Sequence, residues 1–269
     1  MERVRPPAVA GQFYAQDPEA LRAQVEGCLE PEAPRQDAAA IVVPHAGLMY
    51  SGKVAGAVYS RINLPRTALL LGPNHWRLGA AASVAARGRW RTPLGEIPIE
   101  SELAKALLVG SRVLEEDERG HVREHSLEVQ IPFLALLRPE IRIVPVSLAE
   151  ADLGYCRDIG QACARALKCA EAPVLLVVST DLNHYAPQAI SNKKDGMALD
   201  AILALDPEAL HRIVRQHDIS MCGLGPTVAA LYALRDLGPR RAALVRYMTS
   251  GDIDGRRERV VGYGGVIIT

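Results

Sequence analysis

The sequence predicts a single α/β domain in which a mostly parallel or mixed central sheet has helices on both faces. Three observations support this fold class: apolar runs rich in β-branched residues, stretches with helical spacing between them, and the lack of a linker or an internal repeat. The chain has 269 residues, 49% of them hydrophobic, which is enough for one substantial core. We therefore expect residues 1–269 to form one domain.

Six apolar runs are predicted to be strands, because they are short, rich in valine, isoleucine and leucine, and bounded by turn residues. They lack the alternation of apolar and polar residues, which is typical of strands covered on both faces. Residues 87–101 contain the turn signal Pro93-Leu94-Gly95 and predict an irregular excursion or a surface hairpin. The six runs are residues 39–43, 68–72, 141–148, 174–179, 242–248 and 260–269.

Four stretches between these runs have the apolar spacing of helices, at residues 18–30, 52–62, 153–170 and 226–238. The last begins at Pro226 and ends at Gly238, in agreement with the preference for proline in the first turn and for glycine after the last. Three cysteines of the third stretch are expected to be packing residues: Cys156, Cys163 and Cys169.

A further helix is expected in the stretch "REHSLEVQIPFLALL", residues 123–137. Ser126 is a candidate for its N-cap, and Pro132 would then kink the helix, because proline lacks the backbone N–H. Glu124 and His125 would project from the entry of this helix. We expect His125 either to face a cleft or to be held by structural hydrogen bonds.

Composition excludes several function classes. The 31 basic and 31 acidic side chains cancel, so the chain has no electrostatic footprint for nucleic acid or for an anionic membrane. The first residues lack the apolar segment of a secretory signal, and no run approaches the roughly 18 apolar residues of a membrane span. Five cysteines without a C-x-x-C pair argue against a disulfide framework. We expect a cytoplasmic protein with a small ligand.

Histidines follow three of the predicted strands. His45 comes after the first run, in "IVVPHAG", and His75 after the second, in "LLLGPNHW". Asp181 and His184 follow the fourth, in "LLVVSTDLNHY". Ligands of open α/β sheets bind outside the carboxyl ends of the strands, and histidine is both the commonest metal ligand and a good proton-transfer group near neutral pH. The sequence therefore predicts a metal site or an acid/base centre at this edge.

Cys222 lies just before the helix that Pro226 opens. The positive end of a helix dipole favours a thiolate over a thiol, so Cys222 could ligate a metal or attack a substrate. A buried cysteine in a glycine-rich turn is the alternative interpretation.

Seven motifs occur in order along most of the chain: "AGQFY", "VPHAGLMYSG", "LGPNHW", "RTPLGEIPI", "EHSLEVQIPFL", "VVSTDLNHY" and "MCGLGP". In this order they resemble the Memo family, whose prokaryotic members are called AmmeMemoRadiSam system protein B. The resemblance implies a Memo-like domain with a fold similar to that of the class III non-haem iron extradiol dioxygenases. It also implies possible pathway partners of the radical-SAM and AMMECR types.

The resemblance further implies a metal site. Its ligands would be His45, His75 and Cys222, with Asp181 and His184 in the same pocket. Residues expected to line that pocket as well are Asn74, Glu124 and His125. The third ligand could be Asp181 instead of Cys222. A thiolate ligand favours copper or zinc while permitting iron. Because the similar dioxygenases bind iron(II), we expect iron(II) or copper, with zinc as a further possibility.

The leading functional hypothesis is a metal-dependent oxidoreductase, similar to a dioxygenase, that acts on an unknown small substrate. His184 would be its general acid/base, and Asp181 would orient His184. A second hypothesis is a hydrolase in which Cys222 is the nucleophile and His184 its base. The third is a non-catalytic adaptor that binds a small molecule or a peptide in the ancestral pocket.

Overall fold

A nine-stranded mixed sheet forms the centre of the protein, in a computed structural model that describes residues 3–269. Its middle strands run parallel in the order β2, β9, β3 and β8. Antiparallel strands flank them: β12 pairs with β2, and β4 pairs with β8. The bounds of these six strands are Ala40–Val43 (β2), Val174–Ser179 (β9), Thr67–Pro73 (β3), Arg142–Leu148 (β8), Val260–Ile268 (β12) and Ala82–Val84 (β4).

Six further strands complete the main sheet and form a second, smaller sheet. In the main sheet, β10 and β11 both pair with β12, and β7 pairs with β4. A separate small sheet contains β1, β5 and β6. The bounds of these strands are Val4–Arg5 (β1), Arg89–Thr92 (β5), Gly95–Pro98 (β6), Glu115–Glu116 (β7), His184–Ala186 (β10) and Ala242–Thr249 (β11). The turn signal at residues 93–95 therefore connects an antiparallel hairpin, β5 and β6.

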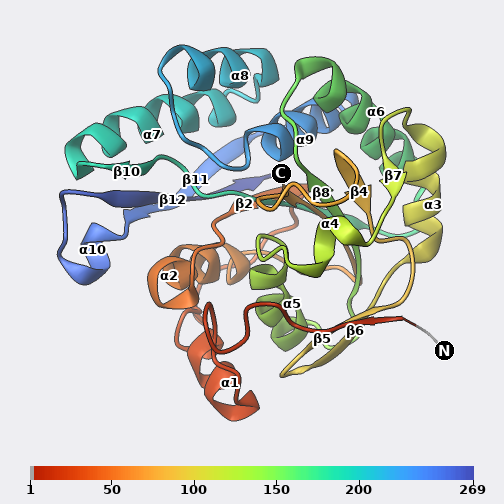
Figure 1. The fold of residues 1–269 in the computed structure, drawn as a ribbon, viewed down its shortest axis with the longest axis horizontal. Coiled ribbons are helices and arrows are strands. Elements are labelled where there is room, and N and C mark those ends of the chain that lie inside the picture. The colour runs from red at the N-terminus through yellow and green to blue at the C-terminus, as the bar shows by residue number, and fades with distance from the viewer. Residues whose placement is uncertain (1–2) are drawn as a thin grey trace.

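Helices cover both faces of the main sheet, as predicted (Figure 1). One face carries α3 (Ser101–Gly110), α6 (Leu153–Cys169), α7 (Gln188–Leu203), α8 (Pro207–Gln216) and α9 (Leu224–Asp236). The other face carries α1 (Pro18–Glu26), α2 (Leu48–Tyr59) and α5 (Ile131–Leu137). Short helical segments are α4 (Arg119–Val122), η1 (Glu128–Gln130) and α10 (Gly251–Asp254).

A hydrophobic core lies on each face of the main sheet, which explains why the strand sequences are continuous apolar runs. In β2, Val42 packs into the core beneath α6 and α9, whereas Ile41 and Val43 pack into the core beside α1, α2 and α5. In β3, Leu69 and Leu70 divide between the two cores in the same way. Because successive side chains point to opposite faces, a strand between two helix layers must be apolar at every position. The α/β fold class and all six predicted strands are confirmed. The expected cover on both faces is wrong for residues 242–248, which form the outer strand β11 and are partly or fully exposed.

The expectation for residues 123–137 is wrong in its details. Ser126 does not cap a helix; its Oγ donates to the backbone carbonyl of Pro73 at 2.8 Å. The chain first forms the turn η1, and α5 begins only at Ile131. Pro132 therefore lies in the first turn of α5, where its missing N–H has no helical partner to lose. Proline starts this helix instead of kinking it.

The cysteines of α6 agree with the expected packing role at two positions. Cys156 and Cys163 are buried, whereas Cys169, at the end of the helix, is exposed. None of the helices within residues 3–269 has both the length and the apolar composition needed to cross a bilayer.

Candidate metal centre

The carboxyl ends of the parallel strands bring the predicted site residues together. Val43 of β2 is paired with Ser179 of β9, so His45 and Asp181 each stand two residues beyond a matched pair. His75 stands two residues beyond the end of the neighbouring strand β3. The imidazole centroids of His45 and His75 are 5.3 Å apart. The strand-end rule therefore placed these residues correctly at one edge of the sheet.

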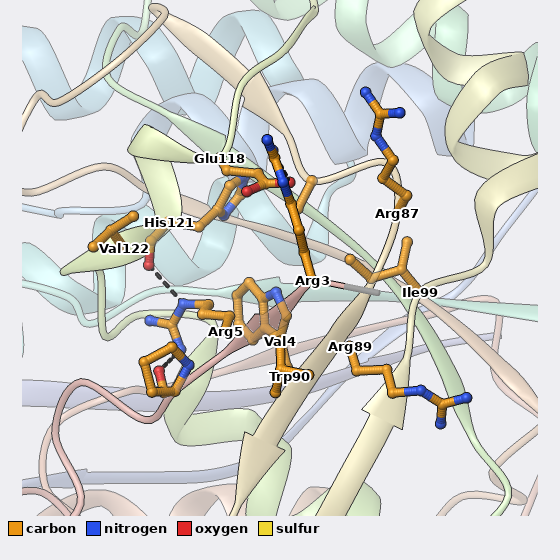
Figure 2. A pocket seen from close by; sticks show the side chains of 12 residues that line it. Arg3, Val4, Arg5, Arg87, Arg89, Trp90, Ile99, Glu118, His121 and Val122 are labelled. Atoms are coloured by element: carbon orange, nitrogen blue, oxygen red, sulfur yellow. Dashed lines mark hydrogen bonds and ion pairs between the residues drawn. The ribbon is translucent and has the colours of Figure 1, made fainter. Parts of the chain in front are cut away.

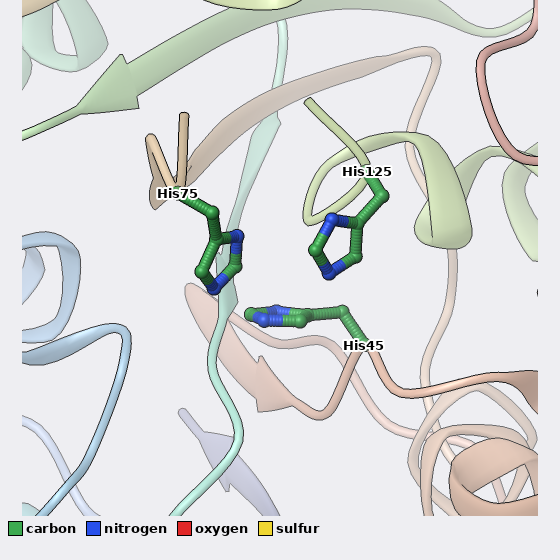
Figure 3. Close-up of side chains that lie close together, drawn as sticks. All are labelled: His45, His75 and His125. Atoms are coloured by element: carbon green, nitrogen blue, oxygen red, sulfur yellow. The ribbon is translucent and has the colours of Figure 1, made fainter. Parts of the chain in front are cut away.

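His125 completes a cluster of three imidazoles with His45 and His75. Its ring stacks on that of His75 with the centroids 4.6 Å apart, and it meets the ring of His45 edge-on at 5.5 Å. Figure 3 shows the three rings converging from three separate segments of the chain. One nitrogen from each ring lies within 4.8 Å of the other two. Across residues 3–269, no other group of three histidine, cysteine or acidic side chains has this spacing.

The carboxylate of Glu124 fixes the tautomer of His75. Its Oε1 lies 2.8 Å from Nδ1 of His75, and its Oε2 accepts the backbone N–H of His75 at 2.6 Å. Burial raises the pKa of Glu124, but the hydrogen bonds from His75 and from the backbone N–H of Ser126 oppose this effect, and the pKa falls to about 2. An ionised carboxylate can only accept, so Nδ1 of His75 carries the proton and Nε2 keeps its lone pair.

Ser179 fixes the tautomer of His45 through a different chain of hydrogen bonds. The Ser179 hydroxyl donates its proton to the carbonyl of Ser126 at 2.7 Å. Its oxygen accepts from Nε2 of Gln130 at 2.9 Å and lies 2.9 Å from Nδ1 of His45. Because the hydroxyl proton of Ser179 is used in the bond to Ser126, Nδ1 of His45 must donate its own proton to the Ser179 oxygen. Nε2 of His45 is therefore an acceptor, and Sγ of Cys222 lies 3.3 Å from it.

Glu124 also holds the backbone around the third imidazole. Its Oε1 accepts the N–H groups of His125 and Ser126, each at 2.9 Å. Burial lowers the pKa of His125 to about 4, and it lowers that of His45 well below the usual value, so both rings are neutral at pH 7. Neutral imidazoles with free Nε2 atoms are suited to bind a metal ion. One buried carboxylate thus positions two of the three rings.

Cys222 lies beside the cluster and ahead of α9, which begins at Leu224. Its Sγ is 3.3 Å from Nε2 of His45, and it accepts the backbone N–H of Asp181 at 3.3 Å. Burial raises the pKa of the Cys222 thiol, and the charge of Asp181 raises it further. Burial therefore opposes the effect expected of the helix dipole, and a thiolate at Cys222 stays a prediction.

Asp181 holds the backbone of His45 instead of the ring of His184. Its Oδ1 accepts the N–H of His45 at 2.8 Å, and burial raises the pKa of this carboxyl group. His184 is oriented by Ser220, whose carbonyl lies 2.8 Å from Nδ1 and whose hydroxyl accepts the N–H of His184 at 2.8 Å. The expectation that Asp181 orients His184 is thus wrong. Nδ1 of His184 is the donor, and its Nε2 is free.

The imidazole cluster lies in an open cleft of two adjoining hollows, of about 530 and 690 Å³, which share Phe13, His75 and His125. The first hollow is also lined by His45, Asp181, His184, Tyr185 and Cys222. The second extends along Trp76 and Arg123, whose guanidinium carbon lies 4.7 Å from the centre of the Trp76 ring. The cleft therefore combines one polar, histidine-rich end with one flat, aromatic end.

Asn74 lies behind the cleft, buried, and its amide donates to the carbonyl of Leu78 at 2.8 Å. It shapes the turn that carries His75. The pocket-lining residues predicted from the sequence thus divide between one that faces the cleft, His125, and two that support it, Asn74 and Glu124.

A strap formed by residues 8–14 closes one side of the cleft. Its Phe13 ring packs on His125 with the centroids 4.6 Å apart, and the Phe13 carbonyl accepts the N–H of Leu48 at 2.7 Å. The buried carboxylate of Glu128 holds the strap: it accepts the N–H groups of Ala8 and Val9 and the hydroxyl of Tyr14 at 2.7 Å. It also pairs with Arg5 at 2.6 Å.

Sequence reasoning missed the residues that act behind the imidazoles, namely Phe13, Glu128, Gln130, Ser179 and Ser220. Four of them carried a usable signal. Ser179 is the last residue of its predicted strand, directly before the polar cluster, Phe13 belongs to the "AGQFY" motif, and Glu128 and Gln130 belong to the "EHSLEVQIPFL" motif. Ser220 gave none, because its partner is distant in sequence.

Comparison with known proteins gives a consistent result. A family model described as Memo-like protein matches residues 5–267. A MEMO1 family protein of Methanopyrus kandleri is 40% identical over 98% of both chains. Another of Methanothermobacter thermautotrophicus is 38% identical over 97% of this chain and 98% of its own. A third, from Ignicoccus hospitalis, is 40% identical over 98% of both chains.

Proposed function

The chain belongs to the Memo-like protein family, and we propose that it is a metal-dependent oxidoreductase whose metal ion is held by Nε2 of His45, His75 and His125. The observation that carries this proposal is the convergence of three imidazoles, with the tautomers of His45 and His75 fixed so that their Nε2 atoms face one point. Hydrogen bonding of Nδ1 to a carboxylate or hydroxyl is the usual support of a histidine ligand.

Cys222 is the best placed fourth ligand. In a tetrahedral site with metal–nitrogen bonds of about 2.0–2.1 Å and metal–sulfur bonds of about 2.3 Å, a nitrogen and a sulfur ligand lie about 3.5 Å apart. The distance of 3.3 Å between Nε2 of His45 and Sγ of Cys222 fits this value. Asp181 is the alternative fourth ligand, through Oδ2, because its Oδ1 accepts the N–H of His45.

Imidazoles with one thiolate suit iron, copper and zinc, and we propose iron or copper as the ion of an oxidoreductase. When bound, a reduced iron or copper ion would supply electrons to dioxygen, and the ion could also polarise a substrate oxygen as a Lewis acid. His184 would transfer protons within the cleft, since Ser220 holds its Nδ1 and leaves Nε2 free. The flat end of the cleft, at Phe13 and Trp76, would receive the substrate.

Metal analysis of the protein purified without oxygen tests this proposal. Because each substitution removes one of the proposed ligands, His45→Ala and His75→Ala are expected to weaken metal affinity by at least about tenfold. Cys222→Ala is expected to reduce metal affinity less, because the three imidazoles would still bind the ion. His217→Ala removes an exposed histidine of another region and serves as the matched control. Wild-type metal content in both His45→Ala and His75→Ala would refute the assignment.

One observation favours a second candidate, a cysteine hydrolase. Sγ of Cys222 lies 3.3 Å from the free Nε2 of His45, which could take its proton and make a nucleophile. This candidate uses His45 as the base in place of His184. It requires activity in protein stripped of metal and loss of that activity when Cys222 is alkylated, whereas the metal-dependent candidate requires loss of activity on chelation.

A further inference from the structure

A second cavity lies outside the metal cleft, between the small sheet and α4, and the proposed function does not use it (Figure 2). Its volume is about 230 Å³. Its apolar wall includes Trp90 of β5, which is 2% exposed, and Ile99, which is 5% exposed. An apolar cavity of about 150 Å³ holds one benzene molecule. The cavity therefore has room for one six-membered ring with two small substituents.

Arg5 forms a rigid side of this cavity. Its guanidinium carbon lies 4.3 Å from the centre of the Trp90 ring. Its donors are used inside the protein, by the carbonyl of His121 at 2.7 Å, the carbonyl of Glu124 at 2.7 Å and the carboxylate of Glu128. Arg5 thus forms part of the cavity wall, and its guanidinium group is hydrogen-bonded without a ligand.

Two other lining arginines are differently placed. Arg3 pairs with Glu118 at 2.9 Å, and Arg87 pairs with Glu116 at 2.8 Å. Both arginine side chains are 69% exposed. Exposed ion pairs of this kind contribute only about 0–1 kcal/mol, so a carboxylate at the mouth of the cavity could share either arginine with its glutamate partner at little cost. The rim therefore offers two guanidinium groups that a ligand carboxylate could contact.

His121 lines the cavity and carries a buried hydrogen-bond acceptor. Its Nε2 lies 3.2 Å from the carbonyl of Ser83, and a carbonyl only accepts, so Nε2 carries the proton. Burial lowers the pKa of His121 to about 4, and the ring is neutral at pH 7. Within residues 3–269, Nδ1 of His121 has no hydrogen-bond partner although it is buried. Such an acceptor is costly unless a donor reaches it.

We propose that this cavity binds a single-ring aromatic carboxylate with a hydroxyl or N–H group at the other end of the ring. The ring would pack on Trp90 and Ile99, the carboxylate would meet Arg3 and Arg87, and the donor would satisfy Nδ1 of His121. None of the three imidazoles lines this site, which shares only Val122 with the metal cleft, through the second hollow of the cleft.

The test uses 4-hydroxybenzoate as the probe and benzoate as the matched compound without the donor. Binding is measured by calorimetry and by the fluorescence of Trp90, which is the remaining tryptophan in a Trp76→Phe background. Because only 4-hydroxybenzoate can donate to His121, we expect it to bind at least about tenfold more tightly than benzoate. No binding up to about 5 mM would overturn the proposal.

Variants locate the bound probe. The double variant Arg3→Gln, Arg87→Gln is expected to weaken binding by at least about tenfold, because both cations that would pair with the carboxylate are lost. Arg123→Gln, the matched arginine of the metal cleft, should leave binding unchanged. In His121→Phe, the preference for 4-hydroxybenzoate over benzoate should disappear. Loss of binding in Arg123→Gln with retention in the double variant would place the probe in the cleft and overturn the proposal.

Discussion

Replacing Glu128 with alanine is expected to lower the free energy of unfolding by about 3–5 kcal/mol, the usual cost of breaking a buried ion pair from one side. Arg5 would be left as a buried cation, since its side chain is 10% exposed and that of Glu128 3%. The N–H groups of Ala8 and Val9 and the hydroxyl of Tyr14 would lose their acceptor as well. Chemical denaturation measures the change.

Glu102→Ala is the matched control for this prediction. Glu102 pairs with Lys105 at 2.7 Å, but the two side chains are 79% and 65% exposed. Such a pair is expected to contribute less than about 1 kcal/mol. If Glu128→Ala cost no more stability than Glu102→Ala, the buried network would not hold the strap over the cleft.

Glu124→Gln is expected to weaken metal binding by about 10–100-fold, the usual effect of removing a carboxylate that supports a histidine ligand. The amide offers one oxygen in place of two, so it cannot accept from both Nδ1 and the backbone N–H of His75 while holding the N–H of His125. The stability of the protein should also fall, by roughly 2 kcal/mol. Competition with a chelating indicator measures the affinity.

Glu115→Gln provides the comparison, because Glu115 is an exposed carboxylate of the short strand β7. It should bind metal as the wild type does. A Glu124→Gln variant with unchanged metal affinity and a normal fold would show that the orientation of His75 and His125 does not depend on this carboxylate.

The sequence was sufficient to predict the fold class, because the pattern that identifies a doubly covered strand is local. A run such as residues 68–72 needs only its own composition to be recognised. The strand-end rule then placed His45, His75 and Asp181 at one edge, since parallel strands share their carboxyl ends. The similarity in fold to the extradiol dioxygenases remains a prediction from the family resemblance.

The parts that sequence reasoning could not supply depend on contacts between distant residues. Ser220 orients His184 from 36 positions away, and Ser179 meets His45 across 134 positions. The sequence places Asp181 three residues before His184, but the position of Asp181 directly beside β2 gives its carboxyl group the backbone N–H of His45. The position of Cys222 before its helix is visible in the sequence, whereas the burial that raises the pKa of its thiol is not.

The central claim is that His45, His75 and His125 hold a metal ion through Nε2, and anomalous X-ray diffraction from crystals of the metal-loaded wild type tests it most directly. Data collected on both sides of the absorption edge of iron or copper would identify the ion. The account predicts one anomalous peak about 2.0–2.2 Å from each of the three Nε2 atoms. A fully loaded crystal whose anomalous peak lies away from these three nitrogens would contradict it.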